Sequence, residues 1–246
     1  MLRGLVVIGA IAAAAAAGGT MLLWPSTPAV SRVASSTCEQ RPERVVIVGA
    51  SFTAGVGPGK PDDSWADLLT RQLHADAIVA GVPGAGYVRT GQGRRGPVMA
   101  ELERIDLPAL APELVIVQAG HDDIGVPANI ERWRVTQAIE LVRAEAPKAR
   151  IALVTVFTRK HPTQAAYRTD SAIVTAARAA DPSVIIMDPL TSHWIFGRVR
   201  DGLHPNVAGS EWLAATVGRA LRANDAIFKP LLSCQPVTRQ GPARST

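Results

Sequence analysis

Three side chains in this sequence are suited to nucleophilic chemistry: one serine, one aspartate and one histidine. Ser51 stands in the stretch RVVIVGASFTAG at 44–55, whereas Asp201 and His204 share the segment DGLHP at 201–205. A serine hydroxyl is a weak nucleophile, and an imidazole held by a carboxylate can take its proton. The short spacing of Asp201 and His204 therefore predicts a base with its orienting group, which can act on Ser51.

Both features also have simpler interpretations. Ser51 could only cap the helix that follows it, because serine oxygens often accept bonds from helix N-termini. Asp201 and His204 could form a hydrogen-bonded cap ahead of the last helix. The stretch around Ser51 leaves its two interpretations even, and the Asp201–His204 pair favours the catalytic one.

The residues before Ser51 predict how the serine is held. Residues 45–48 are Val, Val, Ile and Val, a run typical of a strand buried on both faces in a parallel sheet. Gly49 ends the run and permits a tight turn where a side chain would clash. We expect Ser51 at the carboxyl end of a central strand, where open α/β sheets bind their ligands.

Apolar segments and helical patterns alternate five times along the chain. Strands are predicted at 44–48, 77–82, 114–118, 151–156 and 184–187. Helices are predicted at 62–74, 98–104, 129–145, 163–180 and 206–222, and a glycine-rich loop spans 81–96. Such alternation predicts an α/β fold, a three-layer α/β/α sandwich with a five-stranded parallel sheet.

The composition favours one domain built from small aliphatic side chains. The 246 residues are 47% hydrophobic and only 4% aromatic, and the formal net charge is +5 with a pI near 9.8. The arginines are scattered and few aromatic residues lie among them, so we predict no nucleic acid partner. The charge fits either a mild attraction to anionic envelope polymers and lipids or solubility alone.

The N-terminal residues predict the compartment. No charge occurs from residue 4 to residue 24, a length sufficient to span a bilayer. We interpret 1–24 as an uncleaved signal anchor, with a cleaved signal peptide as the alternative. The remaining boundaries are a Pro/Ser/Thr-rich linker at 25–43, the main domain at 44–223 and a tail at 224–246. The domain should lie outside the cytoplasm, either anchored to the membrane or secreted.

The two cysteines agree with export. Cys38 precedes the first predicted strand and Cys234 follows the last predicted helix. In an exported protein this pair predicts a disulfide between the two ends of the domain, with two unpaired thiols as the alternative.

Four short blocks resemble the motifs of the SGNH (GDSL) hydrolase family. They are 49–55 (GASFTAG), 81–86 (GVPGAG), 118–123 (QAGHDD) and 201–205 (DGLHP). One block would be weak, but four in the family's order and spacing are specific, and the resemblance covers about residues 44–222. It implies a flavodoxin-like fold and the hydrolysis or transfer of acyl esters without a cofactor.

The resemblance also implies roles for individual residues. Ser51 would be the nucleophile, His204 its base and Asp201 the group that orients His204. The backbone amides of Ser51 and Gly84 would donate to the oxyanion. The family's third oxyanion donor, an asparagine, falls at Asp122 in this sequence.

The chain departs from the family pattern at two positions. Ala50 replaces an aspartate, which should affect local hydrogen bonding more than chemistry. Asp122 matters more, because an ionised carboxylate only accepts hydrogen bonds and would repel an oxyanion. Loss of one such donor typically costs about 10²–10³ in rate. Either Asp122 is protonated, or His121 donates instead, or the protein is a weak enzyme or none.

Several other signals carry less weight. Residues 91–96 match GxGxxG but follow no strand directly, which argues against a dinucleotide site. The glycine-rich loop also carries Arg89, Arg94 and Arg95. These arginines could bind an anionic substrate, although solvated side chains are the simpler expectation. We predict no metal site, because His121, Asp122 and Asp123 lack further clustered ligands. Trp194 and Phe196 could line an acyl pocket or pack in the core.

The sequence as a whole predicts an exported serine esterase that acts as a monomer. Its substrate would be an acyl ester of a small molecule, a lipid or a glycan, and its N-terminal helix would contact the membrane. An acyltransferase for envelope glycans or lipids would use the same residues. A non-catalytic envelope-binding module that keeps the fold is the alternative from another class.

Overall fold

The computed structural model describes residues 36–40, 42–224 and 232–236. Five strands of the main domain form one sheet in which every neighbouring pair is parallel. They are β2 (Arg44–Gly49), β3 (Asp76–Gly81), β4 (Leu114–Gln118), β5 (Arg150–Val154) and β6 (Ile185–Met187), in the order β3-β2-β4-β5-β6. The predicted five-stranded parallel sheet is confirmed, and the strand before Ser51 is an interior strand beside the middle one.

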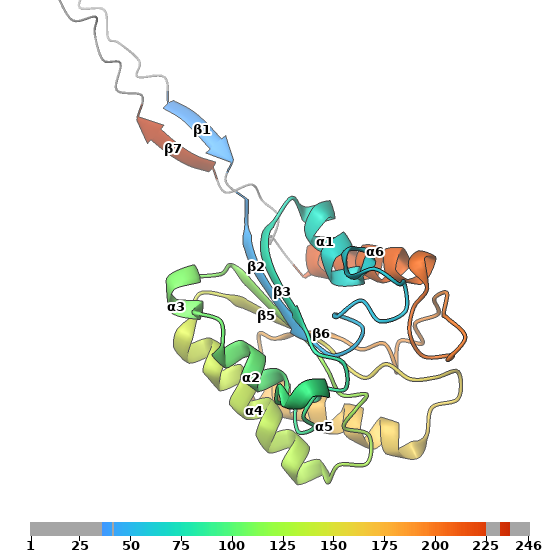
Figure 1. Cartoon of the computed structure of the whole chain (residues 1–246). Helices are drawn as coiled ribbons and strands as arrows, with labels where there is room; N and C mark the ends of the chain where they lie inside the picture. The colour runs from blue at the N-terminus through green and yellow to red at the C-terminus, as the bar shows by residue number, and fades with distance from the viewer. Residues whose placement is uncertain (1–35, 41, 225–231, 237–246) are drawn as a thin grey trace, which may run out of the picture. The chain divides into compact units, whose positions relative to one another are not determined.

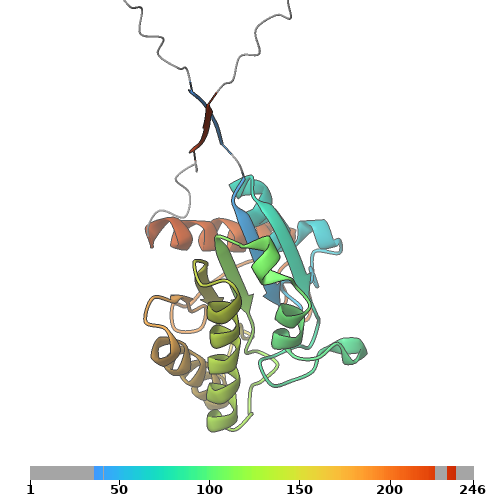
Figure 2. The same cartoon turned by 90° about the vertical axis from the view of Figure 1, so that its left-hand side faces the viewer.

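Helices cover both faces of this sheet, as Figures 1 and 2 show. α1 (Trp65–Leu73) and α6 (Val207–Ala223) pack on one face. The other face carries α2 (Val98–Glu103), α3 (Leu107–Leu110), α4 (Ala128–Glu145) and α5 (Gln164–Ala180). Short 3₁₀ helices span Pro61–Asp63 and Gln92–Arg94. The three-layer α/β/α architecture is therefore confirmed.

The side chains of β2 show why both layers are needed. Val46 and Val48 belong to the core cluster under α2, α4 and α5, whereas Val45 and Ile47 belong to the cluster under α1 and α6. All four are 0% exposed. Successive side chains of a strand point to opposite faces, so a continuous apolar run is what a doubly covered strand requires.

Two further strands lie in segments that the sequence assigned to the linker and the tail. β1 (Ser36–Gln40) and β7 (Leu232–Pro236) form a separate two-stranded sheet. Their sequences, STCEQ and LSCQP, lack the apolar alternation that identifies a strand. Cys38 lies on β1 and Cys234 on β7, so the two cysteines occupy paired strands. The disulfide itself stays a prediction, because these side chains lie outside the described residues.

The predicted signal anchor at 1–24, most of the linker and most of the tail lie outside the described residues. Within the described part of the chain, no helix is both long and apolar enough to cross a bilayer.

Candidate active site

The end of β2 and the turn after it hold Ser51 in place. The turn crowds against β4: a Cβ at Gly49 would lie 2.3 Å from Thr53 Oγ1 and 2.8 Å from the carbonyl oxygen of Gln118. The amide of Ala50 donates to that carbonyl over 3.1 Å and lies 3.3 Å from Gln118 Oε1, which also accepts from Thr53 Oγ1 at 3.0 Å. The buried amide of Gln118 thus fixes the turn that carries Ser51.

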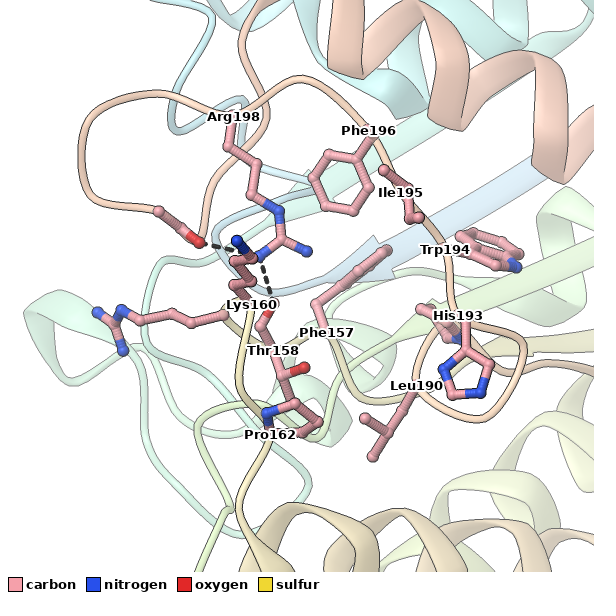
Figure 3. Close-up of a pocket in the computed structure, with 13 residues that line it drawn as sticks. Phe157, Thr158, Lys160, Pro162, Leu190, His193, Trp194, Ile195, Phe196 and Arg198 are labelled. Carbon is pink, nitrogen blue, oxygen red and sulfur yellow. Dashed lines mark hydrogen bonds between the residues drawn. The ribbon is translucent and has the colours of Figure 1, made fainter.

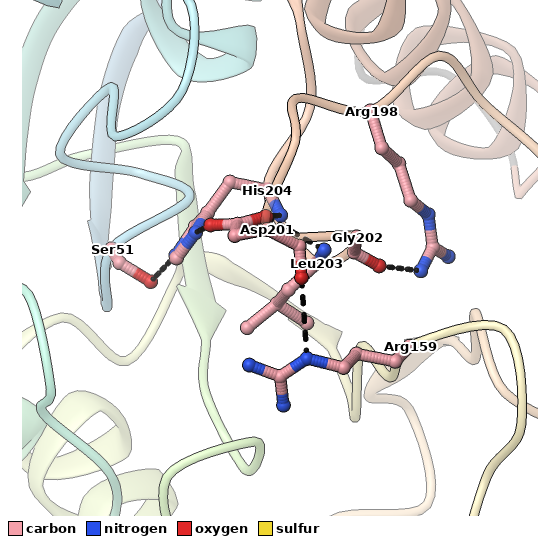
Figure 4. A network of polar contacts seen from close by, with 7 residues as sticks. All are labelled: Ser51, Arg159, Arg198, Asp201, Gly202, Leu203 and His204. Atoms are coloured by element: carbon pink, nitrogen blue, oxygen red, sulfur yellow. Dashed lines mark hydrogen bonds and ion pairs between the residues drawn. The ribbon is translucent and has the colours of Figure 1, made fainter.

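Ser51, His204 and Asp201 form a hydrogen-bonded chain, which Figure 4 shows. His204 Nε2 lies 2.8 Å from Ser51 Oγ, and His204 Nδ1 lies 2.5 Å from Asp201 Oδ2. The second oxygen of Asp201 accepts from the amides of Leu203 and His204 at 2.8 and 3.0 Å. The imidazole is therefore oriented by Asp201 and faces the hydroxyl of Ser51, as the sequence predicted.

Asp201 is ionised across the range in which such a site would work. Partial burial favours its neutral form, but the hydrogen bonds from the His204 ring and from two backbone amides outweigh this and lower the pKa of Asp201 to about 2. Its charge keeps the proton of the neutral imidazole on Nδ1, because Nδ1 donates to the carboxylate. Nε2 is then free to accept the proton of Ser51.

A group of aromatic rings packs beside Ser51 and His204. Phe52, the residue after Ser51, stacks on Phe157 with 4.1 Å between ring centroids and 7° between planes. The His204 ring lies 5.3 Å from Phe52. Phe196 meets Phe52 edge-on and Trp194 contacts Phe157, so the two residues considered for an acyl pocket belong to this aromatic group. They pack partly buried against the core and also line a hollow described below.

The glycine-rich loop is held by a buried carboxylate. Asp123 accepts hydrogen bonds from the amides of Tyr87, Val88 and Arg89, at 2.6, 3.2 and 2.9 Å. A Cβ at Gly86 would lie only 2.1 Å from that carboxylate, so glycine is the residue that allows this approach. Gly84 lies two residues earlier with φ +80°, in a turn that glycine adopts without strain.

A second buried acid lies beside Asp123. Glu131, in the first turn of α4, is 0% exposed. Burial first, and then the Asp123 carboxylate, raise the pKa of Glu131 to about 9. Glu131 is therefore neutral at pH 7 and does not add a second charge beneath the loop that carries Gly84.

This proton makes stability depend on pH. A carboxyl whose folded pKa is raised stabilises the fold fully below its unfolded pKa near 4.5, and the contribution is lost as pH rises towards 9. Between pH 5 and pH 8, we expect the unfolding free energy of the wild type to fall by about 4 kcal/mol relative to Glu131→Gln. Urea unfolding at both pH values measures this difference. Glu140→Gln, an exposed substitution on the same helix, is the control and should show the pH dependence of the wild type. If the unfolding free energies of wild type and Glu131→Gln changed in parallel with pH, the raised pKa of Glu131 would be contradicted.

Asp122 lies near His121 and His204, close enough for their charges to interact. Burial raises the pKa of Asp122, the charge of Asp123 adds to this effect, and the two histidines oppose it. One carboxyl oxygen, Oδ2, is buried without a hydrogen-bond partner among the described residues. A proton on this oxygen would give Asp122 a hydrogen to donate, as the asparagine of the family does.

His121 is poorly placed to replace that donor. Its Nδ1 lies 2.7 Å from the carbonyl oxygen of Phe157, and a carbonyl only accepts, so Nδ1 carries the proton of the neutral ring. Nε2 is then an acceptor. A protonated Asp122 would supply a donor that the neutral ring of His121 does not offer at Nε2.

Two of the loop arginines contact acidic side chains in the described part of the chain. Arg95 forms an ion pair with Glu101 at 3.3 Å, and the backbone of Arg89 serves Asp123. The side chain of Arg94 lies outside the described residues. In the described part of the chain, no group of three or more His, Cys, Asp or Glu side chains is placed to hold a metal ion.

Comparison with known proteins identifies the family. The model of the GDSL-like lipase/acylhydrolase family matches residues 47–212, about two thirds of the chain. The chain belongs to this family. The enzyme class is accordingly an SGNH-type carboxylic ester hydrolase.

One curated relative is a GDSL lipase, and two solved structures share the fold. The chain is 28% identical over 192 residues to GDSL lipase Rv0518 of Mycobacterium tuberculosis, a match that covers 72% of this chain and 81% of that one. A G-D-S-L lipolytic protein of Desulfitobacterium hafniense has the same fold, with a TM-score of 0.56, 18% identity and coverage of 72% and 98%. A family 2 carbohydrate esterase of Corynascus thermopiles also shares the fold, with a TM-score of 0.59 and 18% identity. That match covers 76% of this chain and 68% of the other.

The structure adds residues that the GDSL-like motifs left without a role. Gln118 holds the turn of Ser51, Asp123 holds the glycine-rich loop, and Glu131 is buried beside Asp123. A polar residue at the end of the apolar strand LVIVQ is the signal that could have singled out Gln118. Glu131 has no comparable signal, because an acidic residue in a first helical turn is normally solvated.

Proposed function

We propose that this protein is an exported serine esterase that hydrolyses acyl esters through an acyl-enzyme on Ser51. The supporting observation is the continuous chain from Ser51 Oγ to His204 Nε2 at 2.8 Å and from Nδ1 to Asp201 at 2.5 Å. A nucleophile in contact with its base, and the base in contact with its orienting group, is the arrangement that acyl transfer requires.

The proposed reaction has two steps. His204 takes the proton of Ser51 as Oγ attacks the ester carbonyl, and the amides of Ser51 and Gly84 with protonated Asp122 stabilise the oxyanion. The intermediate collapses, the C–O bond to the alcohol breaks, and His204 gives its proton to the leaving alkoxide. Water then repeats the sequence on the acyl-enzyme and releases the acid and free Ser51.

Export rests on the apolar segment at 1–24 and on the cysteine pair. The placement of Cys38 and Cys234 on paired strands supports a disulfide, and a disulfide fits an oxidising compartment. A glycan ester is a second substrate class, favoured by the fold shared with a carbohydrate esterase. Transfer to a glycan or lipid hydroxyl instead of water would use the same acyl-enzyme.

A fluorophosphonate probe tests the acyl-enzyme step. We expect one covalent adduct per chain on Ser51, located by peptide mass spectrometry, because phosphonates react with an activated serine. Ser51→Ala should take up no probe, whereas Ser192→Ala, which removes an exposed serine, should be labelled like the wild type. A folded wild type that takes up no probe would favour the non-catalytic binding module.

A further inference from the structure

A hollow of about 570 Å³, drawn in Figure 3, is lined in part by Arg198 and Gly202. In Figure 4, Arg198 lies on the other side of the 201–203 segment from Ser51. The volume of the hollow is in the range of small-molecule sites. Thirteen described residues line it: Phe157, Thr158, Arg159, Lys160, Pro162, Pro189, Leu190, His193, Trp194, Ile195, Phe196, Arg198 and Gly202. None of these is acidic, so the lining carries at least three positive charges.

The two arginines of the hollow are held by the backbone that carries the triad. Arg198 Nη1 donates to the carbonyls of Thr158 and Gly202, at 2.6 and 2.8 Å, and its guanidinium lies 4.5 Å from the ring of Phe196. Arg159 Nε donates to the carbonyl of Asp201 at 3.3 Å. These bonds use one nitrogen of each guanidinium, so both arginines keep donors for a ligand. Lys160 is exposed.

Most of the other lining residues are apolar, and Thr158 and His193 are the polar ones among them. Phe157, Leu190, Trp194 and Phe196 form its floor, and Ile195 stands at the surface with 83% of its area exposed. An isoleucine exposed to this degree beside an aromatic floor favours a ligand with an apolar segment. The lining thus combines an apolar surface with three cations and no acidic residue, and the ionised Asp201 acts on Arg198 from outside the lining.

A second hollow adjoins this surface and extends to His121, the residue before Asp122. It has a volume of about 370 Å³, includes His121 next to Asp122, and shares Thr158, Arg159 and Pro162 with the first. Arg159 therefore lines both hollows. A substrate that enters beside Asp122 can extend along the 158–162 segment towards Lys160 and Arg198.

We propose that this surface selects esters that carry an anionic oxygen group, carboxylate or phosphate, several carbons from the reacting carbonyl. The apolar segment of the substrate packs on the aromatic floor, and Arg159, Lys160 and Arg198 bind the anion. This inference rests on the proposed function, because it names the substrate class of the same site.

Matched substrates test the selection. The mono-p-nitrophenyl esters of glutaric, adipic, suberic and sebacic acid carry a terminal carboxylate, and p-nitrophenyl alkanoates of equal length do not. At low salt, we expect kcat/KM of the anionic ester to exceed that of the neutral ester at least about tenfold, at the chain length that reaches the cations. Addition of about 0.5 M NaCl should reduce this anionic-to-neutral ratio, because salt screens the charges. A second pair, 6-acetoxyhexanoate and hexyl acetate, places the anion on the alcohol part.

Charge variants identify the surface. Lys160→Met should lower the anionic-to-neutral ratio at least about threefold, and Lys148→Met, an exposed lysine in another part of the fold, should leave it unchanged. Equal kcat/KM for both members of every pair would overturn the inference and leave the esterase intact. Equal losses in both lysine variants would reduce the effect to net charge and also overturn it.

A binding experiment separates this inference from the proposed function. Calorimetric titration of Ser51→Ala with octanoate, octyl phosphate and 1-octanol needs no turnover. We expect the anions to bind at least about tenfold more tightly than the alcohol, and Lys160→Met to weaken that binding. The comparison of the two anions distinguishes carboxylate from phosphate. If the wild type hydrolyses no ester but Ser51→Ala binds the anions, the esterase proposal fails and the anion site stands. If neither anion binds more tightly than the alcohol, the anion site fails.

Discussion

Ser51→Ala and His204→Ala are each expected to lower kcat/KM for p-nitrophenyl butyrate by about 10⁴-fold or more. Ser51 Oγ and His204 Nε2 are 2.8 Å apart. In the proposed reaction they act as one unit, because the hydroxyl attacks only as its proton leaves for the imidazole. Removing either partner abolishes that step. The double variant should therefore be no less active than the worse single variant, whereas independent roles would multiply the two losses.

Initial rates measure these losses, at enzyme concentrations high enough for the enzymatic rate to exceed spontaneous hydrolysis of the ester. Circular dichroism checks that each variant is folded. Ser192→Ala and His74→Asn are the controls: both positions are exposed, and asparagine tolerates the left-handed backbone of His74 at φ +51°. Both controls should retain wild-type activity. Near-normal activity in folded Ser51→Ala would remove Ser51 from the mechanism and leave a water-based or unrelated reaction.

Asp122→Asn is expected to change activity most at alkaline pH. Burial raises the pKa of Asp122, and only its protonated form can donate to an oxyanion. As pH rises through that pKa, the wild type loses the donor and gains a repulsive charge, whereas the side-chain amide of the variant donates at every pH. The ratio of kcat/KM, variant over wild type, should be at least about 1, rise with pH, and level off at about 10²–10³.

This ratio is measured with p-nitrophenyl butyrate from about pH 5 to about pH 9. Asp122→Ala is a useful comparison, because it removes the charge without supplying a donor and should fall below Asp122→Asn at every pH. A ratio that stays flat, or a large loss of activity in Asp122→Asn, would assign Asp122 a role other than oxyanion donor.

Short-range patterns in the chain are enough to predict the main elements. The continuous apolar run at 45–48 identifies a doubly covered strand, because each face of that strand needs its own layer of helices. The DGLHP segment predicts the Asp201–His204 bond, because the two residues are only three apart and a turn brings them together. These features depend on neighbours in the sequence, and the structure places them as predicted.

Tertiary structure alone decides what surrounds the triad. Phe52 and Phe157 stack although they lie on distant segments of the chain, and the buried Glu131 reaches Asp123 only because α4 packs under the loop. Such contacts form where distant segments meet, so no spacing along the chain encodes them. The same holds for the basic hollow, which needs loops after β5 and β6 to converge. Local order thus predicts the serine and the Asp–His pair, and long-range packing determines the environment that raises the pKa of Asp122, because burial and neighbouring charge exist only in the folded chain.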